Sequence, residues 1–155
     1  MQIRLMTRDD FEQVTQLGKL FAQETKLIPW NSREIDDVHV HRQLYRAMTA
    51  GLSLVAESEQ GIQGILLSVK DTDMWIPSII RLKEMAWWIR PEHRGTNVGV
   101  LLLDSYIERA EAMRERGEIM TYSIGHYVYS PEVAKKLILA KGFKFLESNY
   151  VVGEY

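Results

Sequence analysis

Apolar residues recur along this chain with two periods, and the places where the period changes predict its strands and helices. Apolar and polar residues alternate over residues 1–6, as they do in a strand with one buried face. A spacing of three and four residues begins at Phe11, and a second helical stretch over residues 35–49 ends at Gly51. The first third of the chain is therefore predicted to be a strand followed by two helices.

The middle of the chain alternates again and predicts three strands. Residues 52–57 and 62–70 flank a Ser-Glu-Gln-Gly sequence that favours a tight turn between antiparallel strands. After an irregular but apolar stretch, residues 82–89 form a short apolar and aromatic run. This run stops before Pro91, where proline removes a backbone donor.

The last third of the chain returns to helices and strands in turn. In order, we predict a helix over residues 102–113, a strand over 119–124, a helix that starts at Ser130-Pro131-Glu132 and ends at Lys141-Gly142, and strands over 143–146 and 149–152. The complete order is β-α-α-β-β-β-α-β-α-β-β. It predicts one domain over residues 1–155, with a mixed, twisted sheet and helices on both of its faces.

The composition excludes several classes of function. The 155 residues are 46% hydrophobic and 26% charged, and the formal net charge of −2 gives no field that would gather nucleic acid or an anionic membrane. The chain has no cysteine, which excludes disulfides, thiolate metal sites and a cysteine nucleophile. It opens without the basic and apolar regions of a signal peptide, and no apolar run has the length of a membrane span. We expect a cytoplasmic protein with no nucleic-acid or membrane partner.

The sequence between residues 90 and 99 is the strongest indication of a binding site. It joins a predicted strand to a predicted helix through small residues, so several backbone N–H groups at the start of the helix can stay free and point outward. These groups and the positive end of the helix dipole favour a phosphate-bearing ligand.

This loop resembles the acetyl-coenzyme A sequence of the GCN5-related N-acetyltransferases (GNATs), which is Arg/Gln-x-x-Gly-x-Gly/Ala after a strand that ends in Val-x-Pro. Here the strand ends in Ile-Arg-Pro, and Asn97 stands where the middle glycine is usual. Asparagine tolerates a positive φ better than most residues, so the turn can survive. The resemblance implies that acetyl-coenzyme A is the cosubstrate. It also implies that the cofactor-binding residues are Trp88, Ile89, Arg94, Gly95, Thr96, Asn97, Val98 and Gly99.

The order of the elements extends the resemblance to essentially the whole chain. It implies a GNAT-like α/β fold: a central twisted, mixed but mainly antiparallel sheet of six to seven strands, with about four helices on both faces. Within the family, residues 6–10, Leu17-Gly18 and the ending from Gly142 look like acetyltransferases of tailed bacteriophages and prophages.

A second family sequence, Leu-Tyr-x-x-x-Gly-Phe at the end of the last helix, is matched only in part. Gly142 and Phe143 are present, but Ile138 occupies the tyrosine position. In many GNATs that tyrosine donates a proton to the departing coenzyme A thiolate. Either another donor serves here, or the thiolate leaves unprotonated, or the protein is not a competent acetyltransferase.

Acetyl transfer to an amine needs a base for the amine and a donor for the developing oxyanion. Glu84 lies on the predicted strand over residues 82–89, where GNATs often place an acidic residue that faces the acceptor, and Glu57 is a weaker candidate. His126 and Tyr127, in the loop after the next strand, are candidate acids. Each of these side chains can equally be a surface, packing or capping residue.

The sequence therefore predicts an acetyltransferase that moves an acetyl group from acetyl-coenzyme A to a primary amine of a small molecule or a protein by direct attack. The alternative is a catalytically weak or inactive GNAT-fold module that binds coenzyme A or a protein partner. The four histidines lack the spacing of a metal site, so no metal is expected. Because GNATs often dimerise, a homodimer is a further expectation.

Overall fold

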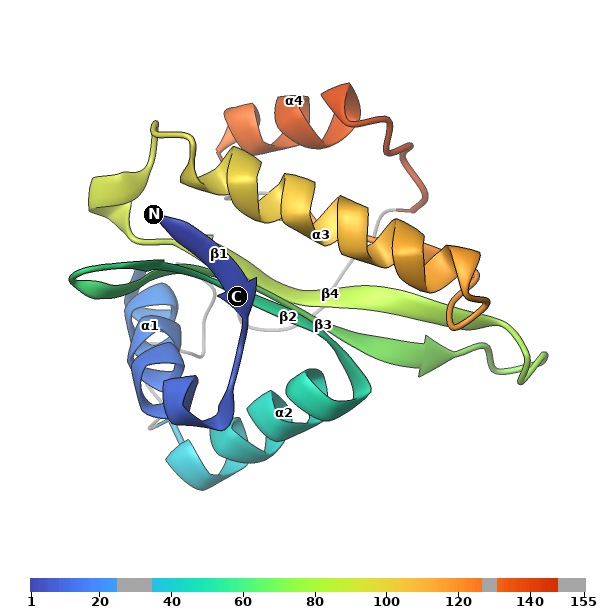
Figure 1. The fold of residues 1–155 in the computed structure, drawn as a ribbon, viewed down its shortest axis with the longest axis horizontal. Coiled ribbons are helices and arrows are strands. Elements are labelled where there is room, and N and C mark those ends of the chain that lie inside the picture. The colour runs from blue at the N-terminus through green and yellow to red at the C-terminus, as the bar shows by residue number, and fades with distance from the viewer. Residues whose placement is uncertain (25–34, 127–130, 148–155) are drawn as a thin grey trace, which may run out of the picture.

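A single sheet connects the elements of the chain (Figure 1). The computed structural model describes residues 1–24, 35–126 and 131–147. Within them the strands are β1 (Gln2–Leu5), β2 (Gly51–Ser58), β3 (Gly61–Thr72), β4 (Ile80–Ile89) and β5 (Thr121–Ser123). The α-helices are α1 (Phe11–Glu24), α2 (Asp37–Ala50), α3 (Val98–Glu115) and α4 (Glu132–Ala140), and short 3-10 turns cover Arg8–Asp10 and Pro91–His93.

The strands lie in the order β1-β2-β3-β4-β5. The first four are antiparallel to their neighbours, whereas β4 and β5 are parallel. The predicted hairpin between β2 and β3 is confirmed, and its turn is followed by Gly61 at φ 95°, which glycine adopts without steric cost. The mixed, mainly antiparallel sheet expected from the sequence is therefore present.

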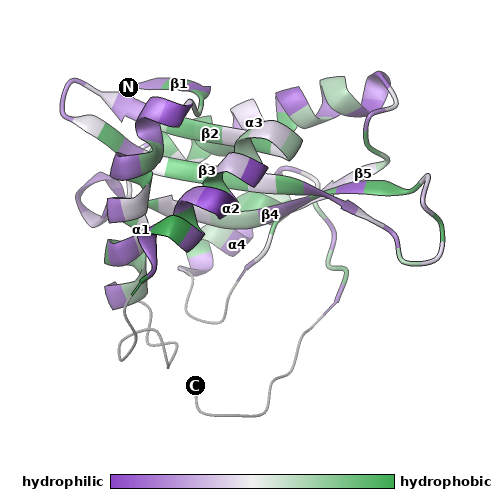
Figure 2. Cartoon of the chain, turned by 90° about the horizontal axis from the view of Figure 1, so that it is seen from below, coloured by the Kyte–Doolittle hydropathy of each residue, from purple (hydrophilic) through white to green (hydrophobic). Residues whose placement is uncertain are grey.

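Helices cover both faces of the sheet, as predicted (Figure 1). α1 and α2 lie on one face, where a core that includes Leu17, Leu44 and Trp88 fills the space beneath them. α3 and α4 lie on the other face, over a core that includes Leu102 and Tyr106. Figure 2 is seen from the side of α1 and α2, with many hydrophilic residues in these two helices and hydrophobic stretches in the strands behind them. The sheet is thus buried on both sides.

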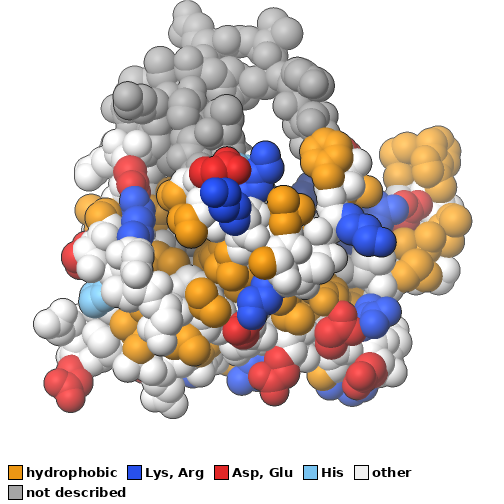
Figure 3. All heavy atoms as spheres, turned by 90° about the horizontal axis from the view of Figure 1, so that it is seen from above, with side chains coloured by type: hydrophobic (Ala, Val, Ile, Leu, Met, Phe, Trp, Pro, Cys, Tyr) orange, Lys and Arg blue, Asp and Glu red, His pale blue; other side chains and the backbone are white. Residues whose placement is uncertain are grey.

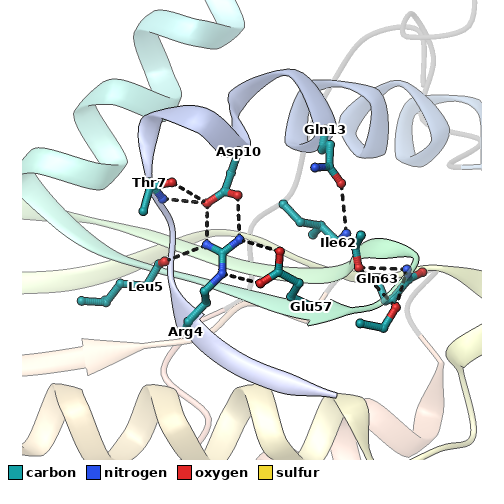
Figure 4. A network of polar contacts seen from close by, with 10 residues as sticks. Arg4, Leu5, Thr7, Asp10, Gln13, Glu57, Ile62 and Gln63 are labelled. Carbon is teal, nitrogen blue, oxygen red and sulfur yellow. Dashed lines mark hydrogen bonds and ion pairs between the residues drawn. The ribbon is translucent and has the colours of Figure 1, made fainter.

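An ion-pair network fixes the N-terminal strand to its neighbours (Figure 4). The Arg4 guanidinium donates to both carboxylate oxygens of Asp10, at 2.7 and 2.8 Å, and to both of Glu57, at 2.7 and 3.0 Å. Hydrogen bonds from Arg4 lower the pKa of both carboxyls. Asp10 also accepts from the Thr7 backbone N–H at 2.7 Å, and the Thr-x-x-Asp spacing in the sequence is that of a capping box. The network joins β1, β2 and the start of α1.

The prediction of six to seven strands is wrong for the described residues, which contain five. The predicted strand over residues 119–124 shortens to β5, and residues 143–146 form no strand. Phe143 instead packs edge-on against Tyr122, with ring centroids 5.5 Å apart, and the side chains of Phe145 and Leu146 point into solvent. The predicted strand over residues 149–152 lies outside the described residues.

The β3–β4 connection projects beyond the helices at one end of the molecule (Figure 1). Its tip exposes Met74, Trp75 and Ile76, and a group of hydrophobic side chains is visible at this end in Figure 3. The Asp73 carboxylate shapes the tip by accepting from the backbone N–H groups of Trp75 and Ile76 at 2.9 and 3.0 Å. None of the helices described is both long and apolar enough to cross a bilayer.

Candidate functional site

The strands β4 and β5 pair over a short distance only and then separate. Their parallel register runs from Arg81↔Thr121 to Lys83↔Ser123 and stops there, while β4 continues to Ile89 along β3. Figure 2 shows β5 beside one end of β4. In the β3–β4 pairing a register shift after Glu84 leaves Met85 without a partner, which is a β-bulge. Beyond the split, one edge of β4 has no strand beside it within the part of the chain that is described.

Glu84 lies at the point where the two strands separate. Its carboxylate oxygen Oε2 accepts a hydrogen bond from the backbone N–H of Gly125, which follows β5, at 2.9 Å. The side chain is half-buried. Burial raises the pKa of the Glu84 carboxyl to about 7, although the Gly125 N–H acts in the opposite direction. A carboxyl with this pKa exchanges protons readily at neutral pH.

The loop before α3 ends in an open row of backbone donors. Among the described residues, none accepts a hydrogen bond from the backbone N–H groups of Gly95, Thr96, Asn97, Gly99 and Val100. The N–H of Val98 makes only a long bond of 3.4 Å to the Thr96 hydroxyl. Asn97 is the N-cap residue of α3, but its side chain caps no N–H. The start of α3 therefore has the free donors and the dipole that suit a phosphate group.

The glycines of this loop have different tasks. Gly95 has φ 77°, which other residues adopt at a steric cost. Asn97 has φ −80°, so the position where GNATs usually have glycine requires no positive φ in this chain. A Cβ on Gly99 would lie 3.0 Å from Ile89 Cδ1, so this glycine allows the first turn of α3 to approach β4 closely.

The Arg94 side chain contacts protein groups and does not extend toward the open donors. Its guanidinium pairs with Glu24 at the end of α1, donates to the Ile89 carbonyl at 2.9 Å and lies 5.4 Å from the Trp88 ring centroid. Hydrogen bonds from Arg94 lower the pKa of Glu24, with a further contribution from the Trp88 indole N–H at 2.9 Å. The Arg94 backbone N–H donates to the Pro91 carbonyl at 3.1 Å, so residue 94 adds no free donor to an anion site, and its side chain joins the loop to α1.

Trp88 and Trp87 face opposite sides of β4. The Trp88 indole is buried in the core beneath α1 and α2, so only its backbone faces the open edge of the strand. The Trp87 indole packs on the α3 side, near Gly99, and its Nε1 is buried without a hydrogen-bond partner among the described residues. On the α1 side, a hollow of about 490 Å³ is lined by Leu20, Gln23, Glu24, Trp88, Arg90, Pro91 and Glu92.

The other predicted residues are dispersed. His126 is exposed after β5, and Tyr127 lies outside the described residues. Ile138 is buried in α4, 8% exposed, so it offers the site no hydroxyl group. Glu57 is bound to Arg4, which lowers its pKa and makes it a poor base. Among the described residues no three His, Asp or Glu side chains come together as metal ligands.

Two contributors to this site were missed by sequence reasoning, Glu24 and Gly125. Glu24 lies 70 residues before Arg94 and Gly125 lies 41 residues after Glu84, so neither contact leaves a local pattern. The sequence offers only an indirect signal, a glycine directly after a predicted strand, and it takes the structure to show that Gly125 has no positive φ to explain it.

The sequence matches no known protein family and no curated protein. The fold, in contrast, is similar to solved structures along nearly the whole chain. A ribosomal-protein-alanine N-acetyltransferase from Brucella melitensis biovar Abortus 2308 has a TM-score of 0.69 at 17% identity, over 99% of both chains. An aminoglycoside acetyltransferase from an uncultured soil metagenomic sample has a TM-score of 0.70 at 12% identity, over 98% of this chain and 97% of the other.

The chain has the GNAT fold. A transcriptional regulator from Bacillus halodurans C-125 shares it as well, with a TM-score of 0.71 at 21% identity over 98% of both chains. Because all three identities are low, the similarity establishes the GNAT fold and leaves the activity to be argued from the site. The relation to phage acetyltransferases stays a prediction.

Proposed function

We propose that this protein transfers an acetyl group from acetyl-coenzyme A to a primary amine. The observation that carries the proposal is the open edge of β4 beyond its split from β5, which leads to the row of free N–H groups at the start of α3. Backbone amides along an extended strand suit a chain of amide groups such as pantetheine, and the helix start suits a pyrophosphate. One ligand, coenzyme A, has both parts in this order.

In the proposed complex the loop residues bind the cofactor through their backbone. The N–H groups of Gly95, Thr96 and Asn97, with those of Gly99 and Val100, receive the pyrophosphate oxygens. The open edge of β4 at Trp88 and Ile89 pairs with the pantetheine amides. Arg94 holds the loop in place through its ion pair with Glu24. Precise orientation of the bound thioester contributes to the rate, and the reaction needs no covalent intermediate on the enzyme.

The chemistry requires a base at the split, and Glu84 is the group we assign to it. The Glu84 carboxylate, directly or through a water, takes the proton from the incoming ammonium, and the free amine attacks the thioester carbon. A backbone N–H of β4 near the bulge at Met85 donates to the oxyanion. The C–N bond forms, the C–S bond breaks and coenzyme A leaves as the thiolate, while the second proton of the attacking nitrogen passes to that thiolate or to solvent, which leaves the neutral amide. The acetyl acceptor is the amine of a small molecule or a protein.

A second candidate function is favoured by Ile138. Because the usual tyrosine hydroxyl is absent at that position, the thiolate must leave unprotonated or receive its proton elsewhere, with His126 and Tyr127 as the candidate donors. A chain that lacks any such donor would bind coenzyme A and transfer acetyl groups slowly or not at all.

Release of the coenzyme A thiol from acetyl-coenzyme A separates these functions. The purified protein is mixed with polyamines, amino sugars or peptides that carry a free N-terminus. Amine-dependent thiol release, with the acetylated product identified by mass spectrometry, is the result expected of a transferase. Binding of coenzyme A without any amine-dependent release would instead support the binding module. Loss of release in Tyr127→Phe or His126→Gln would identify the donor.

A further inference from the structure

The contact between Glu84 and Gly125 stands where the next backbone hydrogen bond between β4 and the β5 segment would be. The pairing of β4 with β5 ends at Lys83↔Ser123. In the residues that follow β5, the next backbone N–H that bonds to a residue of β4 is that of Gly125. Its acceptor is a side chain, the Glu84 carboxylate, at 2.9 Å. The carboxylate thus bridges the two strands at the place where their backbones separate.

Gly125 is a glycine because the carboxylate needs the space. A Cβ at this position would lie 2.9 Å from Glu84 Oε2, closer than a Cβ normally approaches any atom. The backbone gives no other reason, since Gly125 is not among the residues with positive φ and other amino acids could adopt its conformation. Gly125 therefore supplies both a donor and room for the group it binds.

The segment that carries this donor is held by α3. The Tyr106 hydroxyl, on a side chain with no exposed surface, donates to the Ser123 carbonyl at 3.3 Å, and the Tyr106 ring packs edge-on against Tyr122 at 6.0 Å. The end of β5 is thereby fixed two residues before Gly125. A donor on a fixed segment restricts the carboxylate more than a donor on a free loop would.

We propose that Gly125 is a positioning residue that holds the Glu84 carboxylate at the split between β4 and β5, in the orientation in which it accepts the proton of the amine. This inference rests on the proposed function, in which Glu84 is the base. Burial raises the pKa of Tyr106 in α3, and the charge of Glu84 adds to this effect, so Tyr106 is a titratable group that senses the Glu84 carboxylate; His126, the next residue after Gly125, is exposed.

An amide NMR titration tests the positioning without any assay of activity. In the wild-type protein the Gly125 amide resonance should shift with pH through a midpoint near 7, because its acceptor ionises there. The shift should vanish in Glu84→Gln. A Gly125 amide that does not titrate between pH 5 and 9 would overturn the inference.

The variant Gly125→Ala then tests what the position does for transfer. Its methyl group displaces the carboxylate toward solvent, so we expect kcat to fall about tenfold with an unchanged KM for acetyl-coenzyme A. We also expect the acidic limb of the pH–rate profile to move to lower pH, since burial is the main cause of the raised pKa. Gly18→Ala is the matched control, because a Cβ at Gly18 meets nothing within 4 Å.

A shorter acid should restore the fit. Glu84→Asp leaves room for the methyl group, so the loss caused by Gly125→Ala should be smaller in the Glu84→Asp background than in the wild type. Wild-type kcat and an unchanged pH profile in Gly125→Ala would contradict the inference. If the amide titrates but no amine is ever acetylated, the proposed function fails and the positioning of the carboxylate stands.

Discussion

Glu84 is the residue on which the proposed chemistry depends. The pKa of its carboxyl is about 7, so the base is mostly deprotonated only when the pH exceeds that value. Activity should therefore rise with pH through about 7 and level off above it. Glu84→Gln keeps the size of the side chain and an acceptor for the Gly125 N–H but removes the base. We predict that kcat/KM falls about 10²-fold or more and that the acidic limb of the pH–rate profile disappears, both measured by thiol release from pH 5 to 9. Wild-type rates in this variant would exclude Glu84 as the base.

Glu84 should also lower the stability of the folded protein at the pH at which its carboxylate acts as the base. Its folded-state pKa lies above the ordinary value of 4.5, so the folded protein binds the proton more tightly than the unfolded chain and loses stability as the pH rises from about 4.5 to about 7. Glu84→Gln stays neutral and escapes this loss. We expect Tm of the variant to equal that of the wild type near pH 5 and to exceed it at pH 8. A lower Tm at pH 8 would show that the charged carboxylate is stabilised by groups other than Gly125.

Asn97 departs from the family sequence without a conformational reason for glycine at that position. Because its φ is −80°, Asn97→Gly relieves no strain. Asparagine and glycine also differ by only a few tenths of a kcal/mol at an N-cap. We predict that calorimetry will give coenzyme A affinities within about twofold of each other. A large gain in affinity for Asn97→Gly would mean that the asparagine side chain obstructs the site.

At the scale of the elements, the Arg4 network joins the two ends of the β1–α1 segment to β2. Removing the guanidinium in Arg4→Met leaves Asp10 buried and unpaired (Figure 4). We predict a loss of about 2 kcal/mol at pH 7, below the range for fully buried pairs because the Arg4 side chain is 27% exposed.

The pH dependence provides the control for this prediction. The lowered pKa of Asp10 contributes stability above its ordinary value of 3.8, and that contribution disappears as the pH falls through the lowered pKa. The difference between Arg4→Met and the wild type in urea unfolding should therefore narrow toward pH 3. A difference that is independent of pH would assign the loss to packing of the arginine stem.

Elements with a strong period could be predicted from the sequence, and contacts between distant elements could not. The capping box before α1 and the end of α4 at Gly142 follow from local chemistry, and the structure has both. Residues 143–146 alternate like a strand, but within the described chain no neighbouring strand pairs with them, and pairing is a tertiary property. The loop before α3 was predicted from its composition. The direction of the Arg94 side chain was not, because Glu24 is distant in sequence.

At the scale of the whole molecule, the fold places a strand split and a helix start next to each other. The pairing of β4 with β5 ends at residue 83, so the edge of β4 is open beyond it in the described part of the chain. The chain turns at Pro91, and the close approach of Gly99 to β4 lets α3 begin beside that edge. The sequence matches no known family, yet its fold is similar to that of a solved acetyltransferase over 99% of the chain. The backbone donors of the site depend on conformation more than on side-chain identity, so this fold can supply them without a matching family sequence.

The central claim is that the start of α3 binds the pyrophosphate of acetyl-coenzyme A, and a charge at Asn97 tests it most directly. Asn97 is exposed, and a carboxylate at a helix N-terminus stabilises the helix while it repels a phosphate. Isothermal titration with acetyl-coenzyme A should therefore show affinity reduced at least tenfold in Asn97→Glu, which corresponds to a repulsion of about 1.4 kcal/mol or more. Asn97→Gln should bind as the wild type does, and Tm of Asn97→Glu should be unchanged or higher. Equal affinity in Asn97→Glu and the wild type, or no binding by the wild type, would contradict the account.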